Sequence, residues 1–500
     1  MPVDPRTPVV AGVGQTSQRV PPPEAAAPVD LLVRAARAAE ADAGAALLRR
    51  VDVVAVVQIV SWRYPDPGAL AARALGISPR ATAVSTVGGN SPQVLVNELA
   101  ARISRGELDV ALIGGAEAMY TRWRARREPR HELTWESGDD APCGWVIGDD
   151  RPGSSPYEMA HGAVAPTLVY PLFETALRAE AGRDVEAHQR HVSELWSRFA
   201  AVAARNPHAW SRVPYTAEEI RTVGPDNRMV VFPYPKRMCA NIDVDQGAAV
   251  ILCSYEAARA AGVPDDRLVF LHAGAAAHDH WFVTERDSLT RSPAIAAVVT
   301  DALAAAHLTT DDVALFDLYS CFPSAVQVAE REIGLGAGDE RPRTVTGGLG
   351  FAGGPVNDYV THSIAAMVER LRAEPGRVGL TTALGWYLTK HAAGVWSTRP
   401  PEHGFALASG TQARVDAAPR REPAGLVDGV LTVEATAVPF DRDGAPTGAV
   451  VALRTDDGRR ALATVPDAGL AAALTEEAWE GRRVRVHNDG TVNRVEGPAS

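Results

Sequence analysis

The chain contains an internal duplication, because the elements expected between residues 7 and 120 recur in the same order from Arg267 onward. In each copy, apolar strands alternate with amphipathic helices, and a glycine-rich turn precedes the last helix. The paired segments are VVAGVG and VFLHAGA, VDLLVRAARAAEA and AIAAVVTDALAAA, VDVVAVVQIVS and VALFDLYSCF, GALAARALGI and SAVQVAEREIGL, ATAVSTVGG and RTVTGGLGF, SPQVLVNELAARISRG and VNDYVTHSIAAMVERLR, and LDVALIGGAEAM and RVGLTTALGWYL. One β-α-β-α-β-α-β unit has therefore been used twice.

Near-continuous apolar strands between long helical patterns indicate sheets that are buried on both faces. We therefore expect an α/β fold in which the duplicated units pack as a five-layer αβαβα sandwich. With 500 residues and 46% hydrophobic content, the chain is large enough for extensive cores. The predicted domains are 1–268, which includes an inserted loop domain at about 120–230, then 269–420 for the second half, and 421–500 for an additional domain.

The segment 421–500 changes to short alternating strands, with a hairpin turn at Asp456 to Gly458 and a short helix near Leu470. This pattern predicts a small antiparallel β-barrel. Its topology resembles an oligonucleotide-binding barrel, but interleaved aromatic residues do not accompany the strands, so we expect no nucleic-acid binding. Two roles stay open for the barrel: a docking or stabilising module, and a ligand-binding one.

The formal net charge of -11 and the isoelectric point near 5.7 disfavour a nucleic-acid or anionic-membrane partner, and no basic block stands out. The apolar runs are shorter than the ~20 residues that span a bilayer, and the first residues do not resemble a signal peptide. We expect a cytoplasmic protein with no membrane span. The cysteines lack metal-site spacing and a disulfide framework, so we expect no metal. They are Cys143, Cys239, Cys253 and Cys321.

The duplicated unit, the inserted loop domain and the segment ISRGELDVALIGGAEAM resemble thiolases, especially those of the sterol-carrier-protein type. The resemblance covers roughly residues 5–415. With its extra C-terminal barrel, the chain looks most like thiolase-like proteins that are often labelled acetyl-CoA acetyltransferases. The resemblance implies acyltransferase chemistry in lipid or steroid metabolism. It also implies a coenzyme A thioester as substrate or ligand, and no covalently bound cofactor.

The resemblance locates the four catalytic positions of a thiolase, and each carries a different residue in this chain. The nucleophilic cysteine, whose thiolate is stabilised by the start of a helix, corresponds to Gly89. The second cysteine corresponds to Ala383, the histidine of the G-H-P motif to Gly354, and the histidine of the H-D-C-F motif to Tyr319. Glycine and alanine cannot form a thioester, so thiolysis through a cysteine is not expected.

Backbone donors survive such replacements. By resemblance, the N–H groups of Gly89 and Gly385 form the hole that binds a thioester oxygen, and such donors stabilise an enolate without any nucleophile. Tyr319 beside these donors is a candidate catalytic base with a lowered pKa, and the alternative is that it only fills space. Cys321 is either a substitute nucleophile or a buried, inert thiol. The possible pocket residues are Cys321, Lys390 and His391.

Three functions stay open: a retro-aldol-type lyase that acts on acyl-CoA through Tyr319, a non-catalytic acyl-CoA-binding or partner subunit, and an ordinary thiolase. The missing nucleophile disfavours the last. An intact pocket in which Tyr319 faces the backbone donors favours the lyase, whereas a pocket filled by side chains such as Trp386 or Phe351 favours the silent subunit. Thiolases pair through the strand at 81–87, so homodimer and monomer both stay open, as does a protein partner.

Overall fold

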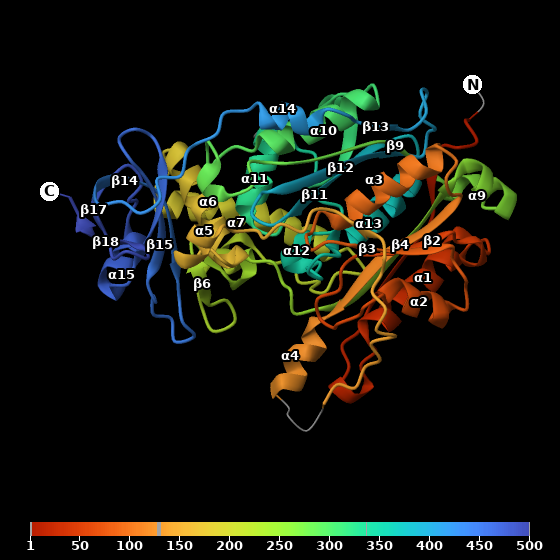
Figure 1. Cartoon of the computed structure of the whole chain (residues 1–500), viewed down its shortest axis with the longest axis horizontal. Helices are drawn as coiled ribbons and strands as arrows, with labels where there is room; N and C mark the ends of the chain where they lie inside the picture. The colour runs from red at the N-terminus through yellow and green to blue at the C-terminus, as the bar shows by residue number, and fades with distance from the viewer. Residues whose placement is uncertain (1–2, 128–131, 337, 500) are drawn as a thin grey trace.

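A computed structural model describes residues 3–127, 132–336 and 338–499, and Figure 1 shows its ribbon. The first copy contains β1 (Pro8–Ser17), α1 (Pro28–Ala43), β2 (Val53–Val56), α2 (Pro67–Leu75), β3 (Ala81–Ser85), α3 (Ser91–Ser104), β4 (Val110–Ala118) and β8 (Asp245–Ser254). The second copy contains β9 (Val269–His278), α10 (Pro293–Ala305), β10 (Val313–Asp317), α11 (Pro323–Glu332), α12 (Gly348–Phe351), α13 (Tyr359–Ala373), β11 (Val378–Gly385) and β12 (Lys390–Ser397).

The order of the strands within the sheet is the same in the two halves. In the first half the neighbours are β3, β2, β4, β8 and β1, and in the second half they are β10, β11, β12 and β9. Thus β2 corresponds to β10, β4 to β11, β8 to β12, and β1 to β9. The halves join where β1 pairs with β9 at Val9↔Phe270 and Val10↔Val269. The predicted duplication and the α/β sandwich are confirmed.

Helices α3 and α13 form the central layer between the two halves of the sheet, whereas α1 and α10 cover the outer faces. Polar side chains of α3 reach the second half directly, because Asn97 Nδ2 donates to the carbonyls of Ala275 and Ala393, both at 3.3 Å. A Cβ on Gly274 would lie 2.3 Å from Asn97 Oδ1, and only glycine permits this approach. The middle of α3 is therefore held between the halves.

The structure does not form the strand predicted at RTVTGGLGF, residues 343–351. The backbone N–H groups of Val345 and Thr346 donate to Asp317 Oδ2 at 2.9 and 3.2 Å. Thr344 Oγ1 donates to the same carboxylate at 3.0 Å, and Pro342 has no N–H to offer to a ladder. The buried carboxylate of Asp317 thus accepts the N–H groups that a strand beside β10 would need for its ladder. The predicted strand at 343–351 was therefore wrong.

The insertion between β4 and β8 contains α4 (Met119–Arg127), β5 (Val146–Ile147), α5 (Pro156–Ala160), α6 (Pro166–Glu180), α7 (Val185–Ala203), α8 (Ala217–Arg221), β6 (Met229–Phe232) and β7 (Tyr234–Pro235). Its strand β5 pairs in parallel with β3, at Val84↔Val146 and Ser85↔Ile147. The insertion, and not the barrel, therefore covers the strand edge through which thiolases pair. This arrangement suits a monomer.

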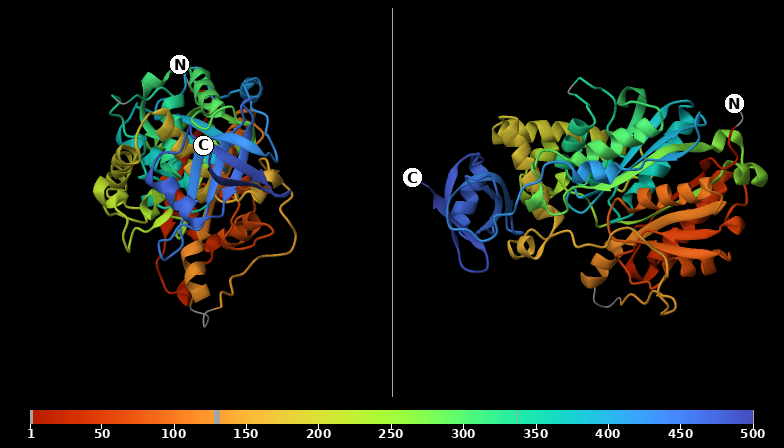
Figure 2. Two further views of the ribbon diagram at one scale, coloured as in Figure 1. Left: turned by 90° about the vertical axis from the view of Figure 1, so that its left-hand side faces the viewer. Right: turned by 45° about the horizontal axis from the view of Figure 1, so that its top comes forward.

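The chain after β12 crosses back over the second half and then enters the barrel. The elements after β12 are β13 (Ala406–Leu407), α14 (Thr411–Asp416), β14 (Gly429–Pro439), β15 (Ala449–Arg454), β16 (Arg460–Val465), α15 (Ala468–Glu476), β17 (Arg483–Asn488) and β18 (Asn493–Pro498). Helix α9 (Tyr255–Ala261) lies earlier, between β8 and β9. The barrel closes in the order β14, β15, β16, β18, β17 and back to β14. Figure 2 shows it at one end of the molecule, beside the insertion. The predicted barrel is confirmed, but it is not antiparallel throughout, because β16 and β18 pair in parallel at Thr464↔Arg494.

The barrel is joined to the rest of the chain by buried polar contacts. Strand β14 of the barrel pairs with strand β6 of the insertion at Val438↔Phe232. Arg178 of α6 forms an ion pair of 2.6 Å with Glu480, and their side chains are 2% and 3% exposed. Arg460 is fully buried, binds Glu434 at 2.7 and 2.8 Å, and also donates to the carbonyl of Val283 at 3.1 Å. A docking or stabilising role for the barrel fits these contacts.

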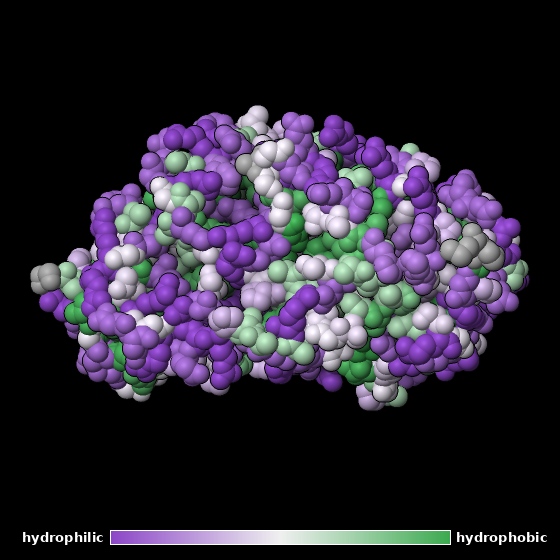
Figure 3. Space-filling model, turned by 90° about the horizontal axis from the view of Figure 1, so that it is seen from above, coloured by the Kyte–Doolittle hydropathy of each residue, from purple (hydrophilic) through white to green (hydrophobic). Residues whose placement is uncertain are grey.

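Hydrophilic residues cover most of the face seen from above, and hydrophobic residues show chiefly in a hollow across its middle (Figure 3). Among the helices that the structure describes, none is long and apolar enough to cross a bilayer.

We predict that Arg460→Met destabilises the protein by about 2–4 kcal/mol, because the substitution removes a buried donor to the carbonyl of Val283 and leaves Glu434 paired only with the half-exposed Arg454, at 3.4 Å. Urea denaturation measures this change in the free energy of unfolding. Its neighbour Arg459 is the control, because its side chain is 46% exposed and pairs with an exposed Asp457, so Arg459→Met should change stability by less than about 0.5 kcal/mol. Equal effects of the two substitutions would contradict this account of barrel docking.

Candidate functional site

The candidate site lies at the glycine turn between β3 and α3. Gly88 has φ +149°, a backbone conformation that L side chains rarely adopt. Its N–H donates to Asn357 Oδ1 at 2.9 Å, and Asn357 Nδ2 donates to the carbonyl of Gln58 at 2.8 Å. The second copy thus fixes the turn that begins α3 in the first copy.

The Tyr319 side chain occupies the space beside Gly89. A Cβ on Gly89 would lie 2.1 Å from Tyr319 Oη, 2.6 Å from Tyr319 Cζ and 2.6 Å from the carbonyl oxygen of Leu384. All three distances are far below van der Waals contact, and one of them is to backbone. A cysteine side chain therefore has no room at position 89 while Tyr319 is in place.

Tyr319 is held at this position by its own backbone and by a second tyrosine. Its N–H donates to Thr382 Oγ1 at 2.9 Å, and its ring meets the Tyr359 ring edge to face at a centroid distance of 5.6 Å. Burial raises the pKa of Tyr319 well above its ordinary value, and the nearby Cys321 thiol raises the pKa further. The predicted lowering of its pKa was therefore wrong, and the phenol is a hydrogen-bond donor at neutral pH.

Asn90 lies between the two glycines that flank the site. A Cβ on Gly88 would lie 2.5 Å from Asn90 Oδ1, and a Cβ on Gly385 would lie 2.4 Å from the same atom. Asn90 is 8% exposed, and its Oδ1 has no hydrogen-bond partner within the described part of the chain. A buried acceptor without a donor is unfavourable, and a ligand donor would satisfy it.

Lys390, the first residue of β12, reaches the same turn. Its Nζ donates to the carbonyl of Val87 and, at 3.1 Å, to the carbonyl of Asp149. The residue is 4% exposed, and desolvation lowers the pKa of Lys390 to about 8, although Asp149 and Asp150 oppose the shift. The site thus contains one buried amine that changes charge not far above neutral pH.

His391 does not join the site, because successive residues of a strand point to opposite faces. A ring nitrogen of His391 lies 3.0 Å from the carbonyl of Leu388 and 3.7 Å from the Asp279 carboxylate. Burial lowers the pKa of His391 to about 3, so the imidazole is neutral.

The other predicted positions add no reactive group to the site. Burial raises the pKa of Cys321 to about 12, which makes its thiol a poor nucleophile at neutral pH. Ala383 is 1% exposed in β11, two residues before Gly385. A Cβ on Gly354 would meet Asn241 and Leu349 at 3.4 Å, which is ordinary contact. The structure therefore brings together Gly89, Tyr319, Gly385 and Lys390.

The turn between β11 and β12 is strained and is supported from outside. Trp386 and Leu388 have φ of +58° and +55°, which is uncommon for large side chains. Tyr170 Oη donates to the carbonyl of Trp386 at 2.9 Å and accepts from the N–H of Leu388 at 3.2 Å. Arg286, which is buried, donates to Thr389 Oγ1 at 2.8 Å. Sequence reasoning missed Tyr170 and Arg286, because their distance along the chain gives no signal.

A segment of the insertion covers the site. A Cβ on Gly153 would lie 2.6 Å from the Trp386 ring, so the two pack closely. Trp281 Nε1 donates to the carbonyl of Pro152 at 2.8 Å, and the Arg151 guanidinium lies 3.7 Å from the centroid of the Trp281 ring. Trp386 thus covers the site together with the insertion, whereas Phe351 packs beside Tyr215 at 6.0 Å between ring centroids.

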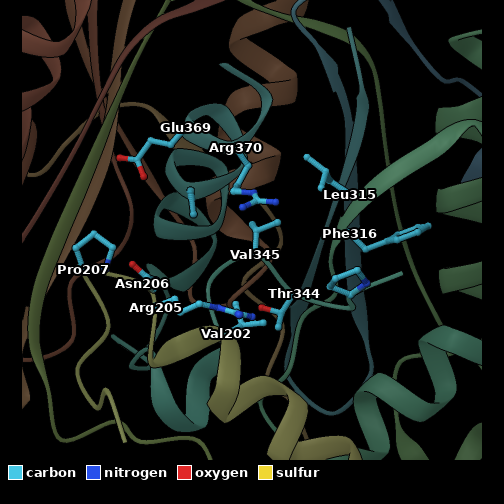
Figure 4. Close-up of a pocket in the computed structure, with 12 residues that line it drawn as sticks. Val202, Arg205, Asn206, Pro207, Leu315, Phe316, Thr344, Val345, Glu369 and Arg370 are labelled. Carbon is cyan, nitrogen blue, oxygen red and sulfur yellow. The ribbon is translucent and has the colours of Figure 1, made fainter. Parts of the chain in front are cut away.

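A separate cavity of about 300 Å³ lies between the end of α7, β10 and α13, where the second copy lacks the predicted strand (Figure 4). The side chains that line it include Arg205, Asn206, Phe316 and Arg370, and none of the glycine-turn residues is among them.

Comparisons with known proteins identify the fold and the C-terminal domain. The model of a family described as "Thiolase-like protein type 1 additional C-terminal domain" matches residues 411–491. The crystal structure of a monomeric SCP2-thiolase like protein type 1 from Mycobacterium smegmatis is 34% identical. The match covers 99% of this chain and 99% of the Mycobacterium smegmatis chain, with a TM-score of 0.84.

Two further relatives are more distant. The structure of the Ltp2-ChsH2(DUF35) aldolase is 20% identical over 79% of this chain and 98% of that chain, with a TM-score of 0.60, and shares the fold. A curated acetyl-CoA acetyltransferase of Methanothermobacter thermautotrophicus is 27% identical over 205 residues, which are 37% of this chain. The chain spans about half of that relative's length, 51%.

We predict that Gly89→Ala lowers the free energy of unfolding by more than about 2 kcal/mol, because the new methyl group meets Tyr319 and the backbone of Leu384. Gly354→Ala is the matched control and should cost less than about 1 kcal/mol. Gly89→Ala should lower the free energy of unfolding by less when Tyr319→Ala is also present, since the clash with the phenol is then removed. Equal stability of the two single variants in urea denaturation would contradict the packing described.

Lys390 makes stability depend on pH. Its pKa is lowered from 10.5 to about 8 on folding, so the unfolded chain binds more protons between these values. The contribution of the Lys390 amine to the free energy of unfolding is complete above pH 10.5. It falls by about 1.4 kcal/mol per pH unit as the pH decreases toward 8. We therefore expect stability relative to Lys390→Met to rise from pH 8 to pH 10. A difference that stays flat across this range in denaturation experiments would show that the amine keeps its ordinary pKa.

Proposed function

Because this chain belongs to the family of type 1 SCP2-thiolase-like proteins, we propose that it binds an acyl-CoA thioester at the glycine turn and forms no acyl-enzyme. The observation that carries the proposal is the position of Tyr319 Oη, 2.1 Å from where a Cβ on Gly89 would be. Acyl transfer through a covalent intermediate needs a nucleophile at that point, and a phenol with a raised pKa does not supply one.

The polar groups of the site support binding of a thioester. The pantetheine arm of coenzyme A carries amide N–H groups, and one of them would satisfy the buried Oδ1 of Asn90. The thioester oxygen would accept from Tyr319 Oη and from the backbone donors at Gly89 and Gly385. Lys390 places a positive charge beside the same turn at neutral pH. We propose that such a ligand belongs to lipid or steroid metabolism, and the similarity to an SCP2-thiolase like protein supports this proposal.

Carbon–carbon cleavage is the second candidate, and Lys390 is the observation that favours it. In a retro-aldol reaction a base takes the proton of a 3-hydroxyl group, the Cα–Cβ bond breaks, and the electron pair forms a thioester enolate that is then protonated. Tyr319 is unsuited as the base because its pKa is raised, but its hydroxyl can donate to the enolate oxygen. The neutral amine of Lys390 would accept the proton above about pH 8.

Titration calorimetry with a non-cleavable thioether analogue of acetyl-CoA tests the proposal. We expect saturable binding that Asn90→Leu weakens by about tenfold, since it removes the acceptor for the pantetheine amide. Asn206→Leu, in the cavity away from the turn, is the control and should bind like the unaltered chain. Absence of binding at millimolar analogue would contradict the proposal and favour a partner subunit without a ligand.

Mass spectrometry separates the two candidate functions. After incubation with acetyl-CoA, the intact protein should keep its mass, and an added acetyl group would contradict the proposal. With a 3-hydroxyacyl-CoA, cleavage that rises above pH 8 and is lost in Lys390→Met would establish the lyase instead of a binding protein.

A further inference from the structure

Helix α4 is a basic element on an acidic chain. It has nine residues, MYTRWRARR, with Arg122, Arg124, Arg126 and Arg127 and no acidic residue, whereas the whole chain carries a net charge of -11. Figures 1 and 2 show it projecting from the end of β4, away from the layers. The expectation that no basic block stands out in the sequence was therefore wrong.

A row of stacked aromatic and guanidinium groups continues from α4 onto the body. The Arg127 guanidinium lies 4.0 Å from the Trp123 ring centroid, and Trp123 stacks with Tyr120 at 6.4 Å. Tyr120 then meets Trp210 edge to face at 5.4 Å, and the Arg19 guanidinium lies 4.0 Å from the Trp210 centroid. Such contacts hold each guanidinium over the face of a ring and leave its charge intact.

Apolar side chains are exposed beside these arginines. Trp123 is 39% exposed, Ile242 48% and Val60 40%. The N–H groups of Met119 and Tyr120 donate to the carbonyl of Val244, which places Ile242 beside the start of the helix, and Arg122 donates to the carbonyl of Val60. Ile242, Val60 and Arg122 thus lie at the base of the helix, and we call Trp123, Arg126 and Arg127, which lie toward its C-terminal end, the α4 surface. It combines positive charge with an exposed indole, as residues at a lipid interface do.

Acidic neighbours do not cancel this charge. The element that contains Glu24, Pro22–Glu24, contacts α4, and Asp243 lies near Arg127 and Lys236. Burial raises the pKa of Asp243, and the charges of Lys236 and Arg127 oppose this shift. Two buried carboxylates lie at the base of α4 as well, because Glu117 is near Arg122 and Asp245 accepts from Thr121. The exposed Arg126 and Arg127 lie at the other end of the helix.

We propose that the α4 surface binds an anionic lipid surface. A projecting helix can meet a plane, and it holds the acidic body away from it: nine residues give a length of about 13 Å, whereas the Debye length is only about 8 Å at physiological ionic strength. The body is therefore screened where the arginines touch the headgroups. Each arginine near an anionic leaflet strengthens binding by roughly fivefold.

A nucleic acid fits this surface less well. Base binding by aromatic residues requires a free ring face. One face of Trp123 packs against Arg127 and the ring also stacks with Tyr120, so its faces are already in use. This inference does not depend on the proposed acyl-CoA binding, because it involves other residues.

Flotation of the full chain with vesicles tests the inference. The probes are vesicles of phosphatidylcholine alone and vesicles with added phosphatidylglycerol, in about 0.1 M salt. We expect binding to the second kind only, weakened at least tenfold in Arg126→Gln/Arg127→Gln and also weakened in Trp123→Ala. The control is Arg49→Gln/Arg50→Gln, which removes the same charge from another exposed pair and should bind like the unaltered chain.

The dependence on salt gives a second readout. At about 0.01 M salt the Debye length is about 30 Å, so the acidic body is repelled, and at about 1 M it is about 3 Å, so the arginines are screened. Binding should therefore be strongest at intermediate salt and weaker at both extremes. Any of four results would overturn the proposal. They are equal binding to the two kinds of vesicle, an equal loss of binding in the control variant, vesicle binding that decreases steadily from the lowest salt concentration, and binding of single-stranded RNA in place of vesicles.

Discussion

The phenol of Tyr319 fills the space beside the α-carbon of Gly89, the position at which the resemblance to thiolases predicts the nucleophile. Their contact is set from both copies of the repeat, since Gly89 begins α3 in the first copy and Tyr319 follows β10 in the second. Thr382 of β11 binds the backbone of Tyr319, and Asn357 binds the backbone of Gly88. The packing of the two halves therefore decides which chemistry the site can perform.

The duplicated copies have diverged in ways that serve this site. The first copy keeps strand β3 and the glycine turn, and the insertion covers its edge through β5. In the second copy, the carboxylate of Asp317 binds the segment after α11, so a strand is absent from the described residues there. Two buried arginines fix the barrel to the rest of the chain: Arg178 joins it to the insertion, and Arg460 joins it to the segment after β9. The barrel thus belongs to one packed structure and does not hang from a linker.

Hydrophobic periodicity was sufficient to predict the duplication, the layers and the barrel, because each of these depends on runs of many residues. The strand at 343–351 was predicted wrongly because side-chain capture by Asp317 leaves no periodic trace. The pKa of Tyr319 was predicted in the wrong direction because burial outweighs donors whose presence the sequence could only suggest. The opposite placements of Lys390 and His391 follow from strand alternation and could have been predicted. The basic run in α4 was readable too, but net charge over the whole chain concealed it.

The most direct test of the central claim is a crystal structure of the full chain with the non-cleavable thioether analogue of acetyl-CoA. The account predicts the acyl oxygen within hydrogen-bond distance of Tyr319 Oη, a pantetheine amide at Asn90 Oδ1, and Tyr319 still against Gly89. An analogue bound away from the glycine turn, or a Tyr319 side chain that has left the space beside Gly89, would contradict it.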